Sequence, residues 1–113
     1  MKSIVILFIL ISSCALAQTT PDSAKYHLDE METVCGHVYA VHVNDKGVSS
    51  IFFGDKNNNP FNAAIFAIDI RKFGDLEKQC LDKKVCVTGW IKKSGSKTQV
   101  IITEPSQLHV VAE

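Results

Sequence analysis

Five short segments of the chain carry strand-like patterns, and one helix-like segment lies between the third and the fourth. The clearest strand pattern runs from Val85 to Ile91, where apolar or small residues at alternate positions share one face. Turn-forming residues separate the segments. The other four strand-like segments are residues 34–43, 48–53, 61–68 and 99–103. These patterns predict a small all-β domain with one short helix.

Residues 69–81 have a helical spacing instead of a two-residue spacing. Ile70, Phe73 and Leu76 recur every three or four residues, which is typical of one face of a helix. Asp69 is placed to cap the start of this helix. Gly74 weakens a long helix, so we expect a short or broken one.

The order of three strands, a helix and two strands matches the OB fold, a five-stranded Greek-key barrel with its helix between strands 3 and 4. The alternation slips near Ala40, which predicts a bulge or strong bend in the first strand. Gly36 suits a tightly coiled barrel wall. We predict that residues 34–110 form this single domain, with residues 108–111 as a terminal extension. Another small β-sandwich is the alternative.

Two cysteine-containing motifs are the most specific feature of this domain: Val-Cys-Gly at residues 34–36 and Val-Cys-Val-Thr-Gly at residues 85–89. Together with other short matches across residues 34–108, they resemble bacterial exported OB-fold domains. That group is similar to the nucleic-acid-binding OB folds of the anticodon-binding type. The resemblance implies the fold, and nucleic-acid binding only by analogy. Residues 57–59 and 94–98 lack aromatic residues that such domains often carry there.

The first 17 residues have the pattern of a cleavable signal peptide. Lys2 precedes an apolar run at residues 4–11, and the small-x-small sequence at residues 15–17 predicts cleavage after Ala17. We therefore expect a secreted or periplasmic protein. The alternative is a lipoprotein anchored at Cys14, because residues 11–14 resemble a lipoprotein box. Residues 18–33 are predicted to form a polar, acidic and mobile arm, with a short helical turn near residues 23–31.

Three cysteines remain after the predicted cleavage: Cys35, Cys80 and Cys86. Cys35 and Cys86 lie on the outward phases of the first and fourth strands, which are neighbours in an OB barrel, so we predict a disulfide between them. Cys80 is then a small buried apolar residue on the helix. A Cys80–Cys86 bridge is the alternative. The cysteine spacing does not fit a zinc knuckle, so we expect no metal and no cofactor.

OB folds bind ligands over strands two and three and the adjoining loops. Aromatic rings there stack on bases, and cations attract phosphates. The formal charge from residue 34 onward is only about +2, which excludes a strongly basic nucleic-acid binder and leaves a local patch. The alternative is that the rings pack beneath the helix or the N-terminal segment. Strand parity predicts that His37, Tyr39, Phe52, Asn62, Phe66, Trp90 and Lys92 point outward, and Lys93 and Lys97 lie in the adjacent hairpin. The predicted nucleic-acid-binding residues among them are Tyr39, Phe52, Phe66, Trp90, Lys92, Lys93 and Lys97.

The sequence carries no Gly-x-Ser-x-Gly, phosphate-binding loop or His-Glu-x-x-His motif. We therefore expect that the protein is not an enzyme and has no catalytic residues. The predicted function is a monomeric exported module that binds single-stranded nucleic acid weakly and without sequence specificity. The alternative is a protein-interaction or envelope-structural domain, and a small anionic ligand or glycan is a third candidate.

Overall fold

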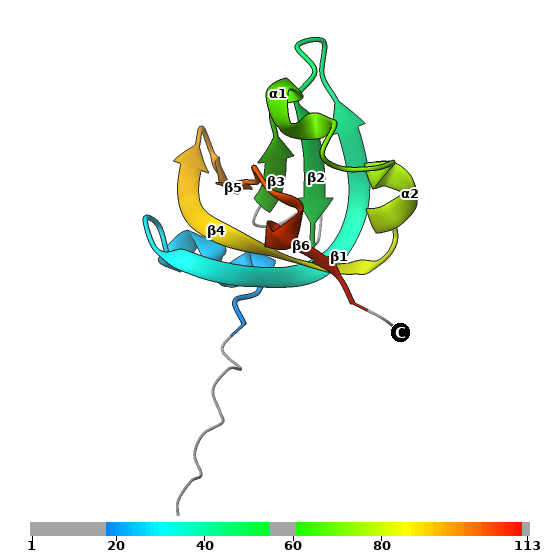
Figure 1. The fold of residues 1–113 in the computed structure, drawn as a ribbon. Helices are drawn as coiled ribbons and strands as arrows, with labels where there is room; N and C mark the ends of the chain where they lie inside the picture. Colours follow the sequence, from blue (N-terminus) through cyan, green and yellow to red (C-terminus); the bar gives the residue numbers. More distant parts are fainter. Residues whose placement is uncertain (1–17, 55–60, 112–113) are drawn as a thin grey trace, which may run out of the picture.

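The computed structural model describes residues 18–54 and 61–111 (Figure 1). The predicted signal peptide, Cys14 and the asparagine loop at residues 57–59 lie outside these residues. None of the helices in the described ranges has the length and apolar character needed to cross a membrane. The strands are β1 (Met31–Val43), β2 (Ser49–Phe53), β3 (Phe61–Ile65), β4 (Lys84–Ser94), β5 (Lys97–Ile101) and β6 (Leu108–Val110). The helices are η2 (Pro21–Tyr26), α1 (Ala67–Ile70), α2 (Leu76–Cys80) and η3 (Pro105–Gln107).

Five strands close into a ring, which confirms the predicted OB fold. The strand order is β1-β2-β3-β5-β4, and β1 also pairs with β4. All of these pairs are antiparallel except β3–β5, which is parallel. The short strand β6 pairs with β4, as expected for a terminal extension. Figure 1 shows the ring with α1 and α2 on the connection between β3 and β4.

Strand β1 takes part in both halves of the ring. Residues 31–37 pair with β4, and residues 38–43 pair with β2. The register shifts between Val38 and Ala40, so the predicted bulge is present where the strand passes from one partner to the other. A bulge increases the local bend and twist, which lets one strand serve two sheets.

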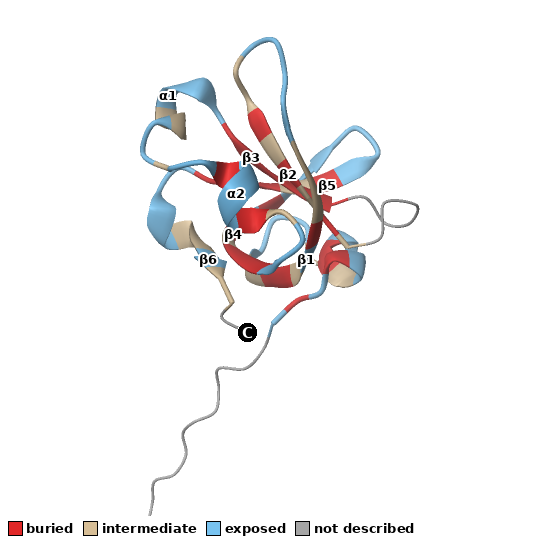
Figure 2. Ribbon diagram, turned by 90° about the vertical axis from the view of Figure 1, so that its right-hand side faces the viewer, coloured by how far each residue is buried: buried red, intermediate tan, exposed pale blue. Residues whose placement is uncertain are grey.

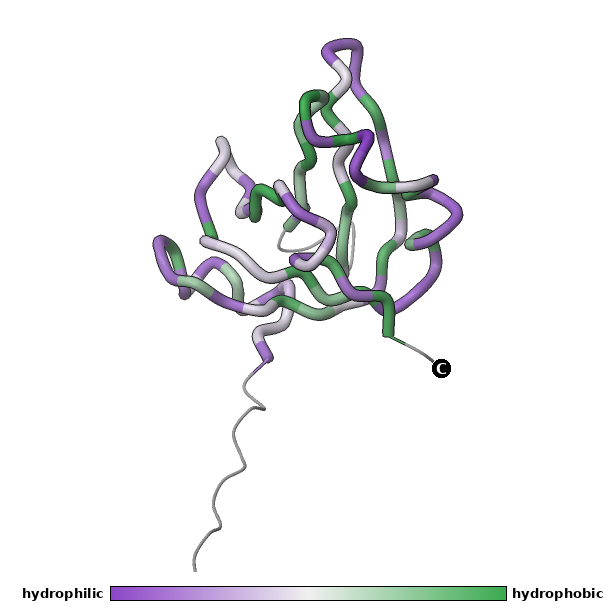
Figure 3. Tube along the Cα trace, in the orientation of Figure 1, coloured by the Kyte–Doolittle hydropathy of each residue, from purple (hydrophilic) through white to green (hydrophobic). Residues whose placement is uncertain are grey.

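The inward faces of the strands form one apolar core. Phe53 and Phe61 pack edge to face at its centre, with ring centroids 5.4 Å apart. Figure 2 shows that buried residues follow the strands, while the turns and outer helix faces are exposed. Hydropathy has the same distribution in Figure 3, with hydrophilic residues in the turns. The largest fully buried side chains also include Ile51, Ile65, Ile91, Ile102, Val34, Val38, Val85, Val87 and Val100.

Residues 18–33, expected to be a mobile arm, pack against the barrel. Pro21 and Ala24 of η2 are buried, and η2 contacts β1, β3 and β4. Thr19 forms a parallel bridge with Val34 through two backbone hydrogen bonds, from Thr19 N to the Thr33 carbonyl and from Cys35 N to the Thr19 carbonyl. Strand pairing begins at Met31, three residues earlier than predicted. The burial of Pro21 and Ala24 is what holds this polar segment in place.

Several other predicted strand boundaries were wrong. Strand β3 ends at Ile65 instead of residue 68, because its partner β2 begins at Ser49, which pairs with Ile65. The fourth strand was predicted to end at Ile91 and the fifth to span residues 99–103, but β4 continues to Ser94 and β5 spans Lys97–Ile101, so the turn contains only Gly95 and Ser96. Gly95 has a φ of +63°, a conformation that glycine adopts without a steric cost in tight hairpins.

The helix between β3 and β4 is broken, as expected from Gly74. Asp69 does not cap it; its carboxylate pairs with Lys72 at 3.0 Å. Asp75 caps α2 by accepting a hydrogen bond from the backbone of Lys78. Leu76 and Cys80 of α2 are buried against the core.

The predicted disulfide joins Cys35 and Cys86, which are register partners on β1 and β4. Their Cα atoms lie 4.0 Å apart, and the bond closes a separation of 51 residues. Cys80 is a free and buried thiol, as predicted, and burial raises its pKa.

The disulfide should contribute measurably to stability. For a closed loop of this size, loop entropy predicts that a C35A/C86A variant loses about 4 kcal/mol of unfolding free energy. Urea unfolding followed by far-ultraviolet circular dichroism measures this loss, because Trp90 is already 54% exposed in the folded protein. Wild-type protein in reducing agent is the matched control and should lose a similar amount. A loss below about 1 kcal/mol would contradict the stabilising role.

Gly36 is where η2 approaches β1 most closely. A Cβ at this position would lie 2.6 Å from Cγ of Pro21, so the ring would have to move. We expect Gly36→Ala to cost about 1–3 kcal/mol of unfolding free energy, as overpacking does elsewhere. Adding Pro21→Ala should recover part of this cost, because alanine has no Cγ. If the changes in unfolding free energy of Gly36→Ala and Pro21→Ala simply add in the double variant, Pro21 does not pack against residue 36.

Candidate ligand-binding surface

The outward side chains of four neighbouring strands form a continuous line, which we call the outer row. Its members are Phe52 of β2, Asn62 of β3, Gln99 of β5 and Lys92 of β4. Each is the register partner of the next: Phe52 with Asn62, Asn62 with Gln99, and Gln99 with Lys92. The residues adjacent to them in sequence, including Phe53, Phe61, Val100 and Ile91, point into the core. The row therefore lies on the outside of the barrel.

An aromatic pair lies at the β2 end of the outer row. The rings of Tyr39 and Phe52 are 6.1 Å apart and inclined by 33°. Nζ of Lys97 lies 5.3 Å from the centroid of the Phe52 ring. Both rings are half-buried. This end of the row thus combines apolar ring surface with a cation from the β4–β5 hairpin.

The centre of the row is formed by two amides. Asn62 Nδ2 donates to Oε1 of Gln99 at 3.5 Å, which is a long hydrogen bond. Asn62 is only 5% exposed, so most of its side chain is covered by its neighbours. Gln99 is the more accessible of the two.

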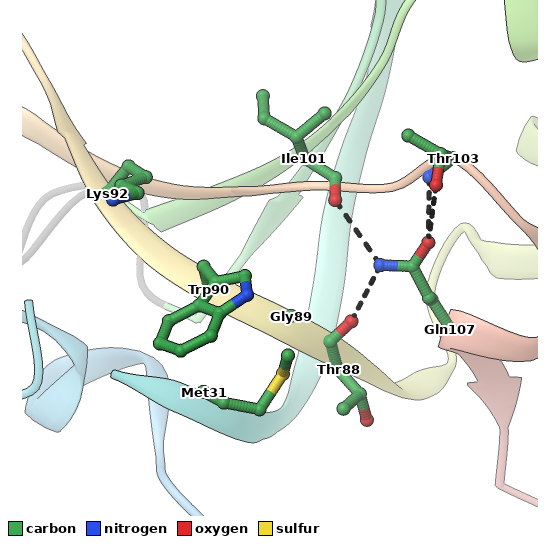
Figure 4. A pocket seen from close by; sticks show the side chains of 8 residues that line it. All are labelled: Met31, Thr88, Gly89, Trp90, Lys92, Ile101, Thr103 and Gln107. Atoms are coloured by element: carbon green, nitrogen blue, oxygen red, sulfur yellow. Dashed lines mark hydrogen bonds between the residues drawn. The ribbon is translucent and has the colours of Figure 1, made fainter. Parts of the chain in front are cut away.

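An apolar groove of about 500 Å³ adjoins the β4 end of the row. Met31 and Trp90, which are register partners, lie beside each other on one side of it (Figure 4). They are 52% and 54% exposed. Gln107 is fixed at the other side, where its amide donates to the carbonyl of Thr88 at 3.0 Å. Lys92 also lines the groove, and its ammonium pairs with Asp29 at 2.8 Å.

The structure brings together most of the predicted ligand-contacting residues. Trp90 and Lys92 lie at one end, and Tyr39, Phe52 and Lys97 at the other. Lys93 pairs with the buried Thr98, so it lies on the other face of β4 from Lys92 and outside the row. Phe66 is separate: it is the N-cap of α1, four residues beyond Asn62 and about 13 Å away along the chain. Strand parity had also placed Asn62 on the outer side. Gln99 and Met31 were missed because parity was not applied to the fifth strand and because Met31 falls in the segment expected to be an arm.

A second group of polar side chains was not predicted. His27 Nδ1 lies 2.9 Å from Oε1 of Glu30 and 3.6 Å from Oε2 of Glu32. The hydrogen bond with Glu30 raises the pKa of His27 and lowers the pKa of Glu30. The backbone beside this group is hydrogen-bonded to β4 at Ile91, adjacent to Trp90.

No protein-family model matches the sequence, and no curated protein matches it. Solved structures do match the fold. The protein ygiW from E. coli matches with a TM-score of 0.54 and 18% identity over 84% of this chain and 90% of that one. The second OB-fold domain of replication protein A from Methanococcus maripaludis matches with a TM-score of 0.51 and 12% identity over 84% and 97%.

The aspartyl tRNA synthetase from Entamoeba histolytica also matches, with a TM-score of 0.59 and 13% identity over 86% of this chain. The match covers 21% of the synthetase, so this chain corresponds to about a fifth of it. At these identities the likeness establishes the OB fold and no further property.

Trp90 provides a direct test of the groove, because it is the only tryptophan in the sequence. Its exposure predicts fluorescence emission close to that of a solvated indole and efficient quenching by acrylamide. Met31→Ala should increase quenching further, because Met31 lies beside the indole. The protein unfolded in urea gives the upper limit of acrylamide quenching. Blue-shifted emission that resists the quencher would show that the groove is covered.

Proposed function

We propose that this chain is a binding module that holds single-stranded nucleic acid along the outer row, weakly and without sequence specificity. The observation that carries the proposal is the Tyr39–Phe52 pair with Lys97 beside it. It lies on the strand face that OB folds use for oligonucleotides and oligosaccharides. Rings for stacking next to a cation for phosphate are the two elements of sequence-tolerant single-strand binding.

Stacking on Phe52 requires Lys97 to move away from the ring. A cation–π contact at an exposed site contributes about 0.5–1 kcal/mol. Base stacking on an aromatic ring contributes about 1–3 kcal/mol. The exchange is therefore favourable, and the displaced ammonium becomes available to a phosphate. Lys97 is thus positioned to contact the backbone of a strand whose base covers Phe52.

The dimensions and charge of the row explain why binding would be weak. Four strands about 4.8 Å apart give a row about 14 Å long, which suits the short end of the 4–16 nucleotides that OB folds contact. Lys92 is already paired with Asp29, so the positive charge is concentrated near the hairpin. Asn62 is largely covered, which limits the reading of base edges.

We further propose that the module acts outside the cytoplasm and has no catalytic activity of its own. The Cys35–Cys86 disulfide supports an exported location, because such bonds persist in oxidising compartments. The signal-peptide pattern in residues 1–17 supports the same location.

A protein-binding role is the second candidate. The exposed Met31–Trp90 pair supports it, since aromatic residues and methionine are enriched at protein interfaces. In that case a partner would occupy the groove rather than the Phe52 end of the row.

Titration of a labelled deoxythymidine 12-mer, followed by anisotropy, tests the first proposal. We expect binding at 20 mM salt that weakens strongly at 200 mM, because phosphate contacts release counterions. Phe52→Leu should weaken binding about tenfold by removing the stacking ring while keeping apolar volume. Phe66→Ala is the matched control, an exposed aromatic outside the row. No binding at low salt, or equal losses in both variants, would reject the proposal.

A further inference from the structure

The side chains of His27, Glu30 and Glu32 converge on one point from three parts of the backbone. His27 is the C-cap of η2, Glu30 follows in the turn, and Glu32 lies on β1. One donor atom from each residue lies within 4.8 Å of the other two. Donors bound tetrahedrally to Zn²⁺ at 2.0–2.2 Å are about 3.3–3.6 Å apart, so only small side-chain rotations separate this group from a coordinating geometry.

The expectation of no metal considered only the cysteines. We propose instead that His27, Glu30 and Glu32 bind a divalent transition-metal ion, with Zn²⁺ as the best-fitting candidate. One imidazole nitrogen and two carboxylate oxygens are donors that Zn²⁺ accepts. The two carboxylates balance the charge of a dication. Three protein ligands leave a fourth position for water, as in open zinc sites. Mg²⁺ and Ca²⁺ prefer oxygen alone and fit this set less well.

The two carboxylates point to the same imidazole nitrogen, so a single ion could contact both of them and the imidazole. Nδ1 carries at most one proton, so it can donate fully to only one of the carboxylates. Glu30 is the closer, at 2.9 Å, and Glu32 remains at 3.6 Å. A dication placed between the three donor atoms interacts favourably with all of them.

A hydrogen bond outside the donor set orients Glu32. Thr19 Oγ1 donates to Oε1 of Glu32 at 2.8 Å, which leaves Oε2 directed toward His27. Contacts of this kind fix the orientation of metal ligands and raise metal affinity. Thr19 is itself buried and held to β1 by two backbone hydrogen bonds.

The backbone between the donors is also fixed. Glu30 N donates to the His27 carbonyl at 3.1 Å, closing the turn. Asp29 N donates to the Ile91 carbonyl, and Ile91 N donates to the Glu30 carbonyl, so the turn is attached to β4. The backbone that carries the donors therefore needs little ordering on binding, which lowers the entropic cost. The site does not depend on the proposed nucleic-acid function.

Calorimetric titration of chelator-treated protein with zinc chloride at pH 7.5 tests the proposal. We expect one ion per chain and affinity at least tenfold lower in His27→Ala and in Glu32→Gln. Thr19→Val, which removes only the orienting hydroxyl, should weaken binding about tenfold. His42→Ala, an exposed histidine on the far end of β1, is the matched control and should bind as the wild type does. Glu32→Gln is close to isosteric, and circular dichroism should show that it folds.

A second measurement separates coordination from unspecific binding. Zinc should shift the Nδ1 resonance of His27 in nitrogen-15 NMR and leave that of His42 unchanged. Wild-type affinity in both His27→Ala and Glu32→Gln would mean adventitious ions only and would overturn the proposal. Magnesium or calcium binding as tightly as zinc would also overturn it, since the imidazole would then have no role.

Discussion

The pairing of β1 with two different strands is the constraint on which the rest of the structure depends. Its first half is hydrogen-bonded to β4 and its second half to β2, so this one strand closes the ring. The bulge between Val38 and Ala40 marks the change of partner. The Cys35–Cys86 bridge joins β1 to β4 within the first half. If β1 paired with only one partner, the apolar inner faces of the other strands would remain open to water.

The outer surface follows from that closed core. Side chains alternate along each strand, so burying Phe53, Phe61 and Val100 places Phe52, Asn62 and Gln99 outside in one line. A slip of one residue in any pair would exchange the two faces, at the cost of burying amides and exposing the aromatic core. The register that stabilises the fold therefore also aligns the outer row.

The order of the strands and the faces of most of them could be predicted from the sequence, because both depend on local residue patterns. Residues 85–91 and 34–43 predicted the neighbouring strands and the cysteine pair. The packing of η2 against the barrel could not be predicted. Pro21 and Ala24 show no periodicity, and their burial depends on the shape of the barrel end. The group at His27 depends on a turn in which Asp29 has a φ of +65°, and nothing in the sequence marks this turn. Phe66 was misplaced because the end of β3 is set by its partner β2.

The two ends of the outer row differ in charge. At the Trp90 end, Lys92 is paired with Asp29, and the carboxylates of Glu30 and Glu32 belong to the same segment. At the Phe52 end, Lys97 lies over an aromatic ring, and Lys93 is exposed nearby on the hairpin. An anionic strand would therefore be drawn to the hairpin end, and apolar groups of a ligand to the groove beside Trp90. A polyanion lying along the whole row would approach the carboxylates, so the charge pattern itself favours a short ligand held from the hairpin.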